Sequence, residues 1–218
     1  IPVDTKVKTI PHVFGIEDKE VYITKWITYL LNIEGLRKEF LHAFFEVAGK
    51  ECNIFSKDED NNMEVYSEYT FSDGRRIDIL VKTPKSIIGI ENKIWSDEQE
   101  NQTKDYYISM SAIAKAECKD QVFGFYLHPR EDQKSESDKF SDILYSDLIK
   151  HLKTKKYQNC DMSAFEKMMF NEFKNYVKEH LDMNKSVDFP SKDGSVKFFY
   201  EHFDTISKLQ DSRIKYLD

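Results

Sequence analysis

Three charged side chains lie within or at the end of two apolar segments that are predicted to be neighbouring strands. Asp78 interrupts the apolar run 76–81, and Glu91 and Lys93 close the run 86–93. Because side chains alternate along a strand, Glu91 and Lys93 should point to the same face of the sheet. If the two runs pair, Asp78 meets them there, and two carboxylates and one ammonium converge at one end of the sheet.

Such a cluster is suited to binding a divalent cation. Two carboxylates close together repel each other, and charges on the buried face of a strand are costly without a partner. Mg²⁺ takes one or two carboxylates together with waters and phosphate oxygens. A bound ion would neutralise a phosphodiester and lower the pKa of a bound water. Lys93 could orient or deprotonate that water, and we expect its pKa to fall if it is partly buried beside the cation.

A hairpin and a parallel crossover are the elements that must position these residues. Alternating and apolar runs predict strands over 63–71, 76–81, 86–93 and 121–127. The Asp-Gly turn within 72–75 predicts antiparallel pairing of the first two strands. A helix over 96–118 predicts that the last two are parallel, and Ser96 with Gln99 three residues later has the pattern of a capping box at its start. The polar segment 128–139 is predicted to be an exposed loop.

Apolar residues at helical spacing predict further helices on either side of these strands. The predicted segments are an irregular lead-in over 1–16, helices over 18–48 broken at Asn32 and Gly35, a strand at 143–148 leading into a helix at 147–154, and a helix over 161–182. This order predicts an α/β fold in which a mixed sheet is flanked by helices. We expect one domain over 1–182, with a linker and a C-terminal helix over 183–218 packed on it.

The strand-end residues resemble the motif of the PD-(D/E)XK nuclease superfamily. The motif reads Ile77-Asp78, then twelve residues, then Glu91-Asn92-Lys93. Ile77 stands where the family has proline, which is a frequent substitution in divergent members. The resemblance covers roughly residues 15–155 and implies the restriction-endonuclease-like fold, with a hairpin and parallel strands between helices.

A second motif lies on the helix that follows. Gln102 and Tyr106 are four residues apart and share a helix face. The pair resembles the QxxxY motif of the RecB-like branch of the superfamily, whose Gln and Tyr line the active site. The wider string from Ile88 to Tyr106 also resembles a group of bacterial PD-(D/E)XK proteins.

The resemblance implies a nuclease that hydrolyses DNA phosphodiester bonds with Mg²⁺ or Mn²⁺. Asp78 and Glu91 would bind the metal, with the backbone carbonyl of Asn92 as a further ligand, and Lys93 would act on the attacking water. Gln102 and Tyr106 would fix the site or the scissile strand. Family members often complete the metal shell with a Glu from the first helix. Glu20 is the candidate taken here, and Glu17 and Glu68 are the alternatives.

The composition restricts how nucleic acid could be bound. The 218 residues carry 32 Lys and Arg against 39 Asp and Glu, a formal net charge of −7. Nucleic-acid binding must then rest on bound cations or on a local basic edge. The candidates for that edge are Arg75, Arg76, Lys82, Lys85 and Lys104.

The sequence also predicts where the protein works. No apolar run approaches the roughly 20 residues that a membrane helix needs, so no membrane partner is expected. Three widely spaced cysteines without a CxxC favour a reducing cytoplasm over a disulfide framework or a zinc site. The first residue is Ile1, and we expect the natural start to lie upstream. The sequence leaves the oligomeric state open, a dimer included.

Simpler interpretations compete with the nuclease. Asp78 could face solvent, Glu91 and Lys93 could form an exposed ion pair worth about 0–1 kcal/mol, and Gln102 and Tyr106 could belong to an ordinary helix face. Trp95 is expected to pack in the core, and the alternative is that it packs beside a nucleic-acid base. The main alternative function is a catalytically inactive module of the same fold that binds or scaffolds a partner. A plain interaction domain with charged strand ends is the second, and it predicts no shared pocket for the three side chains.

Overall fold

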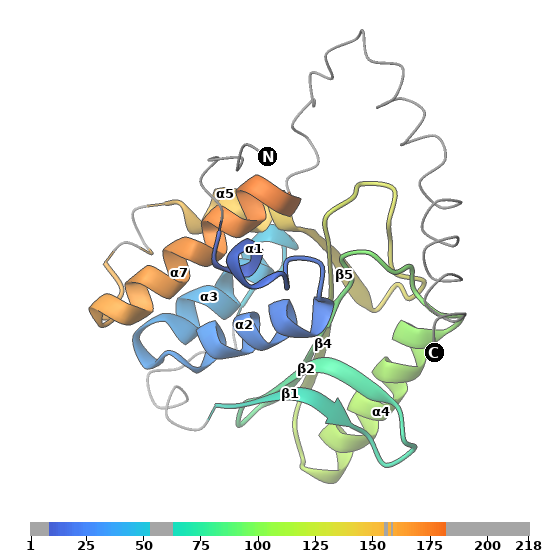
Figure 1. Cartoon of the computed structure of the whole chain (residues 1–218). Helices are drawn as coiled ribbons and strands as arrows, with labels where there is room; N and C mark the ends of the chain where they lie inside the picture. Colours follow the sequence, from blue (N-terminus) through green and yellow to red (C-terminus); the bar gives the residue numbers. More distant parts are fainter. Residues whose placement is uncertain (1–8, 53–62, 155–156, 158, 182–218) are drawn as a thin grey trace, which may run out of the picture. The chain divides into compact units, whose positions relative to one another are not determined.

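The computed structural model describes residues 9–52, 63–154, 157 and 159–181 (Figure 1). The chain divides into two units, Ile1–Met183 and Asn184–Asp218. The predicted linker and C-terminal helix over 183–218 lie outside the described residues. Everything below concerns the first unit.

A five-stranded mixed sheet forms its centre. The strands lie in the order β1 to β5, so neighbours in the sequence are neighbours in the sheet. Their bounds are β1 Glu64–Thr70, β2 Arg76–Lys82, β3 Ser86–Asn92, β4 Gln121–His128 and β5 Phe140–Leu144. The first three strands are antiparallel, whereas β4 is parallel to β3 and β5 is parallel to β4. The predicted hairpin and the predicted parallel crossover are both confirmed.

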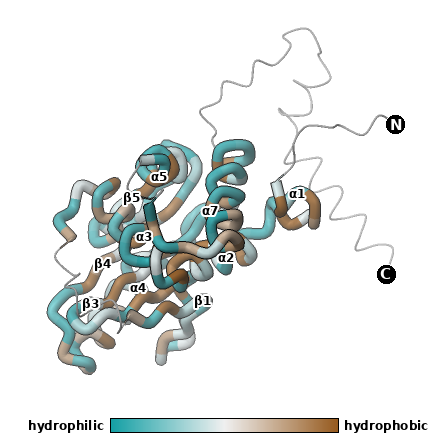
Figure 2. Tube along the Cα trace, turned by 90° about the vertical axis from the view of Figure 1, so that its left-hand side faces the viewer, coloured by the Kyte–Doolittle hydropathy of each residue, from teal (hydrophilic) through white to brown (hydrophobic). Residues whose placement is uncertain are grey.

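Helices cover both faces of the sheet (Figure 1). One layer holds α1 Ile10–Phe14, α2 Glu20–Asn32, α3 Glu34–Val47, α5 Tyr145–Leu152, α7 Ala164–Tyr176 and the π-helix η2 Val177–Leu181. Helix α4, Gln102–Ala116, covers the opposite face. Apolar residues concentrate along the strands and α2 (Figure 2). The arrangement is the predicted α/β fold, a mixed sheet between helices.

Two apolar clusters follow from the alternation of the strands. Ile79 and Val81 of β2 pack into the cluster formed with α2, α3, α5 and α7, whereas Leu80 packs with Met110 of α4 on the other face. Every residue of β3 is buried, as expected for a central strand covered on both faces. Glu91 and Asn92 at its end are therefore taken out of water by the fold itself.

Two predictions about the helices that precede the sheet are wrong. Residues 10–14 form the helix α1 within the predicted irregular lead-in. Gly35 lies inside α3 and does not break the helix; the break falls at Ile33, whose backbone is extended. A Cβ on Gly35 would lie 1.8 Å from the carbonyl oxygen of Asp161, so glycine is needed there for a close approach of two chain segments.

The start of α4 also differs from the prediction. The helix begins at Gln102, after Asn101 in a left-handed conformation, and not at Ser96. The hydroxyl of Ser96 donates instead to Glu20 on α2, over 3.3 Å. The carboxylate of Glu98 accepts the backbone N–H of Thr103 over 2.7 Å and so satisfies a free donor of the first turn. A tertiary contact has taken the serine that the capping pattern assigned to the helix.

Candidate active site

The ends of β2 and β3 and the start of α4 enclose a pocket of about 420 Å³. Its lining residues are mostly charged or polar: Arg75, Arg76, Asp78, Glu91, Lys93, Gln99, Glu100, Gln102, Asp105 and Tyr106. Five residues with predicted catalytic roles, Asp78, Glu91, Lys93, Gln102 and Tyr106, share this one pocket. The interaction-domain alternative, which predicts no common pocket, is therefore wrong.

Asp78 and Glu91 are brought together by the register of the hairpin. Ile79 pairs with Ile90 in the antiparallel β2–β3 ladder, so the next position places Asp78 across from Glu91. A carboxylate oxygen of Asp78 accepts the backbone N–H of Asn92 over 2.8 Å in place of a ladder bond. Because the N–H and C=O of one strand residue point to the same edge, the Asn92 carbonyl also leaves β3 on the Asp78 side.

Lys93 and Glu91 form a buried ion pair. The Nζ atom lies 3.1 Å from Oε1 of Glu91, and the two side chains are only 13% and 2% exposed. The alternative interpretation, in which Glu91 and Lys93 form an exposed ion pair, is therefore wrong. Removing one partner of such a pair leaves an uncompensated charge in a low dielectric, which costs far more than breaking a surface pair.

Gln102 and Tyr106 hold the buried glutamate from the opposite side. The amide nitrogen of Gln102 donates to Oε1 of Glu91 over 2.9 Å and to the hydroxyl of Tyr106 over 2.8 Å. That hydroxyl donates in turn to the carbonyl of Arg76 over 2.6 Å. The two helix residues therefore orient Glu91 and tie α4 to β2. They are more than an ordinary amphipathic face.

Burial raises the pKa of both carboxyl groups, and the charge of Asp78 raises that of Glu91 further. Burial raises the pKa of Asp78 to about 6, although the Asn92 N–H and Lys93 oppose the shift. Burial and then the charge of Asp78 raise the pKa of Glu91 to about 8. Perturbed pairs of this kind are typical of functional sites.

Without a metal, the pKa of Lys93 is raised. Burial by itself would lower its pKa, but the nearby carboxylates, Glu91 foremost, outweigh burial and raise the pKa above its ordinary value. The three acidic neighbours Glu91, Asp78 and Glu20 hold the ammonium in its charged form. The lowered pKa expected for Lys93 beside a bound cation stays a prediction.

The predicted acid from the first helix reaches the edge of the site. Glu20 lies in the first turn of α2, and its carboxylate accepts a bond from the Ser96 hydroxyl. Burial raises its pKa, and the charge of Lys93 opposes that shift. Its role as a metal ligand remains a prediction. Of the alternatives, Glu17 accepts a bond from the Tyr176 hydroxyl at its carbonyl oxygen.

Glu68 adds a feature that sequence reasoning missed. It lies between the β1–β2 pairs Ser67–Ile79 and Tyr69–Ile77, which is opposite Asp78, and its φ of 54° is left-handed. Left-handed non-glycine residues are uncommon and often mark functional sites. Its carboxylate pairs with Arg76 over 2.9 Å, beside the pocket.

The side chain of Asn92 anchors β3 to the helical layer on the far side. Its amide donates to the Thr24 hydroxyl over 3.0 Å, and its oxygen accepts the hydroxyl of Tyr145 over 2.6 Å. Thr24 lies one helical turn after Glu20 on the same face of α2. The hydrogen bond between Asn92 and Thr24 therefore sets the position of α2 relative to the end of β3, and with it the position of Glu20. No local sequence pattern signals this network.

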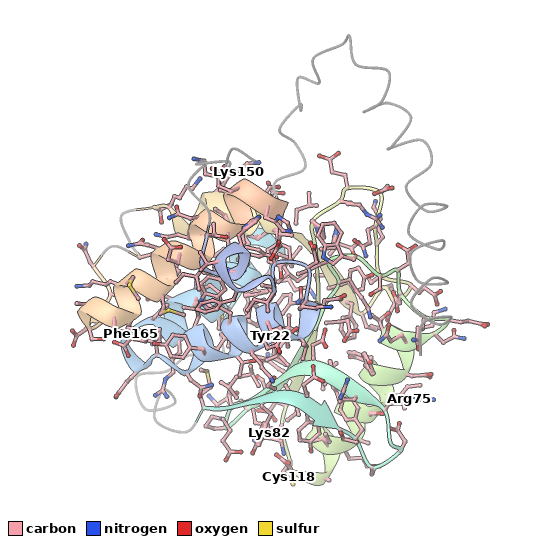
Figure 3. The ribbon with its side chains drawn as sticks, in the orientation of Figure 1. Tyr22, Arg75, Lys82, Cys118, Lys150 and Phe165 are labelled. Atoms are coloured by element: carbon pink, nitrogen blue, oxygen red, sulfur yellow. The ribbon has the colours of Figure 1, made fainter. Side chains whose placement is uncertain are left out.

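The predicted basic edge is split between two ends of the sheet. Arg75 and Arg76 line the pocket, and Arg75 also pairs with Asp105 of α4 over 3.0 Å (Figure 3). Lys104 lies 3.5 Å from Glu136. In contrast, Lys82 ends β2 and lines a different pocket, where it pairs with Glu117. Lys85 lies beyond it in the β2–β3 turn. Of the five predicted basic residues, Arg75 and Arg76 are the two that line the pocket of the candidate site.

The donor set fits a hard divalent cation. Oε2 of Glu91 is buried and has no hydrogen-bond partner among the described residues, which is the environment that a cation would complete. Within the same residues, no three His, Cys, Asp or Glu side chains are grouped to hold a metal by themselves. An ion that takes two carboxylates and fills its shell with water and phosphate oxygens matches this set, and a protein-only cage does not.

Comparison with known proteins agrees with the geometry. In the described part of the chain, no helix combines the length and apolar character that crossing a bilayer needs. Neither a search of curated proteins nor a search of solved structures finds a significant match. The model of one family, the PD-(D/E)XK nuclease superfamily, matches residues 10–203, which is most of the chain. Members of this superfamily are generally nucleases that act on nucleic acid with divalent metals. This chain belongs to the PD-(D/E)XK nuclease superfamily.

Proposed function

We propose that this protein is a nuclease that hydrolyses DNA phosphodiester bonds with Mg²⁺ or Mn²⁺. One observation carries the proposal: Asp78, Glu91 and Lys93 converge in a single pocket, with Glu91 and Lys93 almost fully withdrawn from water. Two buried carboxylates that repel each other cost stability, and a bound cation would offset that cost.

The residues divide the work by their chemistry. Asp78 and Glu91 would hold the cation through their carboxylates. The backbone carbonyl of Asn92, which leaves β3 on the Asp78 side, would supply a third oxygen. When bound, the cation neutralises phosphate charge and lowers the pKa of a bound water. Lys93, held protonated by its acidic neighbours, donates hydrogen bonds that orient the water and stabilise the negative charge that develops on the phosphate oxygens.

The surrounding residues keep this arrangement rigid and place positive charge at the edge of the pocket. Gln102 and Tyr106 hold Glu91 in one rotamer through the bonds described above. Arg75 and Arg76 stand at the pocket as exposed guanidinium groups suited to flanking phosphates. A small basic rim on an acidic protein favours binding that weakens steeply with salt.

A substrate and metal matrix tests the proposal. Plasmid, linear duplex, single-stranded DNA and RNA are each incubated with Mg²⁺, Mn²⁺ or chelator. We expect metal-dependent cleavage of DNA by the wild type and none by Asp78→Asn. A calorimetric Mn²⁺ titration should show binding to the wild type and its loss in Asp78→Asn. Folded protein that cleaves none of the substrates would instead support the inactive binding module, and identical titrations would reject Asp78 as a ligand.

A further inference from the structure

Trp95 is exposed, although the sequence suggested that it packs in the core. The protein has two tryptophans. Trp26 is buried at 8% exposure, whereas Trp95 is 43% exposed. The expectation of a core position is therefore wrong for Trp95. Single exposed aromatic residues are common on protein surfaces, so the position and neighbours of this one must decide whether it has a role.

Its position is at the edge of the candidate active site. Trp95 follows Lys93 by two residues, directly after β3 ends. Its backbone N–H is close enough to the carboxylate of Glu20 to lower the pKa of that group, and the charge of Glu20 acts on both Lys93 and Asp78. Trp95 does not line the pocket itself, but it lies two positions along the chain from Lys93, which does.

The backbone on both sides of Trp95 is fixed. Before it, the N–H of Lys93 donates to the carbonyl of Leu127 over 2.9 Å. After it, the Ser96 carbonyl accepts a bond from Gln133 over 2.8 Å, and Asp97 pairs with Arg130 over the same distance. Gln133 and Arg130 belong to the segment 128–139, which was predicted to be an exposed loop. Gln133 is in fact buried, so the segment braces the Trp95 loop.

The indole also has a fixed aromatic neighbour. The His180 ring lies 5.7 Å from Trp95 in a T-shaped arrangement, with 76° between the ring planes. His180 is itself held by His12, Tyr176 and Asp18. It sits in the π-helix η2, a type of turn that occurs frequently at functional sites. An edge-to-face contact covers at most one face of the indole, so the other face is left for a planar ligand.

We propose that Trp95 is a stacking platform for an unpaired nucleobase, and that the substrate strand is therefore single-stranded at the active site. The inference rests on the proposed function and specifies its substrate class. Bases within a duplex are already stacked on both faces, whereas an unpaired base can offer a face to an aromatic side chain. A rigid indole loses little conformational entropy on binding, and base stacking on such residues tolerates any sequence.

Fluorescence provides a test that does not require cleavage. Wild-type protein is titrated with a short oligothymidine in Ca²⁺, with the oligonucleotide shown by gel to stay intact. We expect quenching of tryptophan emission by the oligothymidine and much less by an equally long abasic strand or a blunt duplex. Trp95→Phe, which retains only the buried Trp26, should lose this quenching. Acrylamide should quench Trp95 in the free protein, since the indole is open to solvent.

Affinity measurements complete the test. Trp95→Ala should bind the oligothymidine roughly tenfold more weakly, because loss of a stacked base costs about 1–3 kcal/mol and 1.4 kcal/mol is tenfold. Its affinity for the abasic strand should change less than about twofold. Phe165→Ala is the matched control, since Phe165 is an exposed aromatic on α7, on the other side of the molecule from Arg75 (Figure 3). It should bind like the wild type.

Two results would overturn the inference. One is a loss of affinity in Trp95→Ala that is equal for the abasic strand and the oligothymidine. The other is a Trp95 already shielded from acrylamide in the free protein, which would assign the indole to a contact within the chain. Metal-dependent cleavage together with either result would leave the proposed nuclease intact and remove only the platform. Base-dependent quenching without cleavage by any metal would keep the platform and reject the nuclease.

Discussion

Gln102 donates to Oε1 of Glu91, and the same oxygen faces the ammonium of Lys93 at 3.1 Å. Both donors act on one oxygen, so the second oxygen, Oε2, is left buried and free of hydrogen bonds among the described residues. The glutamate is thus fixed through one atom and available through the other. This division of one carboxylate between protein and ligand is the basis for the predictions below.

Lys93→Ala should reduce cleavage by about 10²- to 10⁴-fold, the range associated with removing a group that handles a proton or a developing charge. Metal binding and the circular dichroism spectrum should be retained. Lys119→Ala is the matched control, because the Lys119 side chain is also 13% exposed but contacts Thr83 at the other end of the sheet. Wild-type turnover by purified Lys93→Ala would disprove the catalytic assignment.

Tyr106→Phe should lower kcat by about 10- to 100-fold while changing KM little. The hydroxyl accepts a bond from Gln102, which orients Glu91, and loss of such a supporting group typically has an effect of this size. Tyr107→Phe on the same helix provides the control and should keep wild-type kcat. A Tyr106→Phe enzyme that instead loses only substrate affinity would place the hydroxyl on the substrate.

The metal-free protein should lose stability as the pH rises from about 4 to 8. Since the folded-state pKa of Glu91 is raised to about 8, its protonated form favours folding. That contribution is complete below the pKa of the unfolded chain, near 4.3, and is lost as the pH passes through the folded value. Thermal unfolding in chelator at pH 5, 6.5 and 8 measures the loss.

Glu91→Gln should reduce this pH dependence, leaving the part that comes from Asp78, and raise the unfolding temperature at pH 8, since the neutral amide carries no buried charge. One kcal/mol corresponds to about 2–4 °C for a protein of this size. Mg²⁺ should stabilise the wild type more at pH 8 than at pH 6, because protons and metal compete for the same oxygens, and it should not stabilise Glu91→Gln. Parallel pH profiles for the wild type and Glu91→Gln would contradict the raised pKa.

Tyr145→Phe should destabilise the fold by about 1–3 kcal/mol, the cost of leaving the buried oxygen of Asn92 without its donor. Thr24→Val removes the other partner of the same amide and should cost a similar amount. The double variant should cost less than the sum, because both partners act through one side chain. Denaturant unfolding of the four proteins measures the coupling, and strict additivity would show that the amide does not link α2 and α5.

The sequence alone determined the features that depend on short-range order. Alternation, the Asp-Gly turn and the helical crossover specify the strand pairing, and Asp78 and Glu91 come together because they belong to adjoining strands of one hairpin. The spacing of Gln102 and Tyr106 places both on one helix face. The nuclease motif and most of the residues that line its pocket could therefore be predicted from the sequence.

Only the tertiary structure decided the features that depend on contacts between distant segments. Ser96 leaves its predicted cap to bond Glu20, Gln133 is buried against the Trp95 loop, and Asn92 is joined to Thr24 and Tyr145. These partners are 37 to 76 residues apart in the sequence. A periodic pattern reports which face of an element is buried, but it carries no information about which element covers that face, because the hydrophobic effect is non-directional. The supports of the site, and the exposure of its tryptophan, follow from how the layers pack.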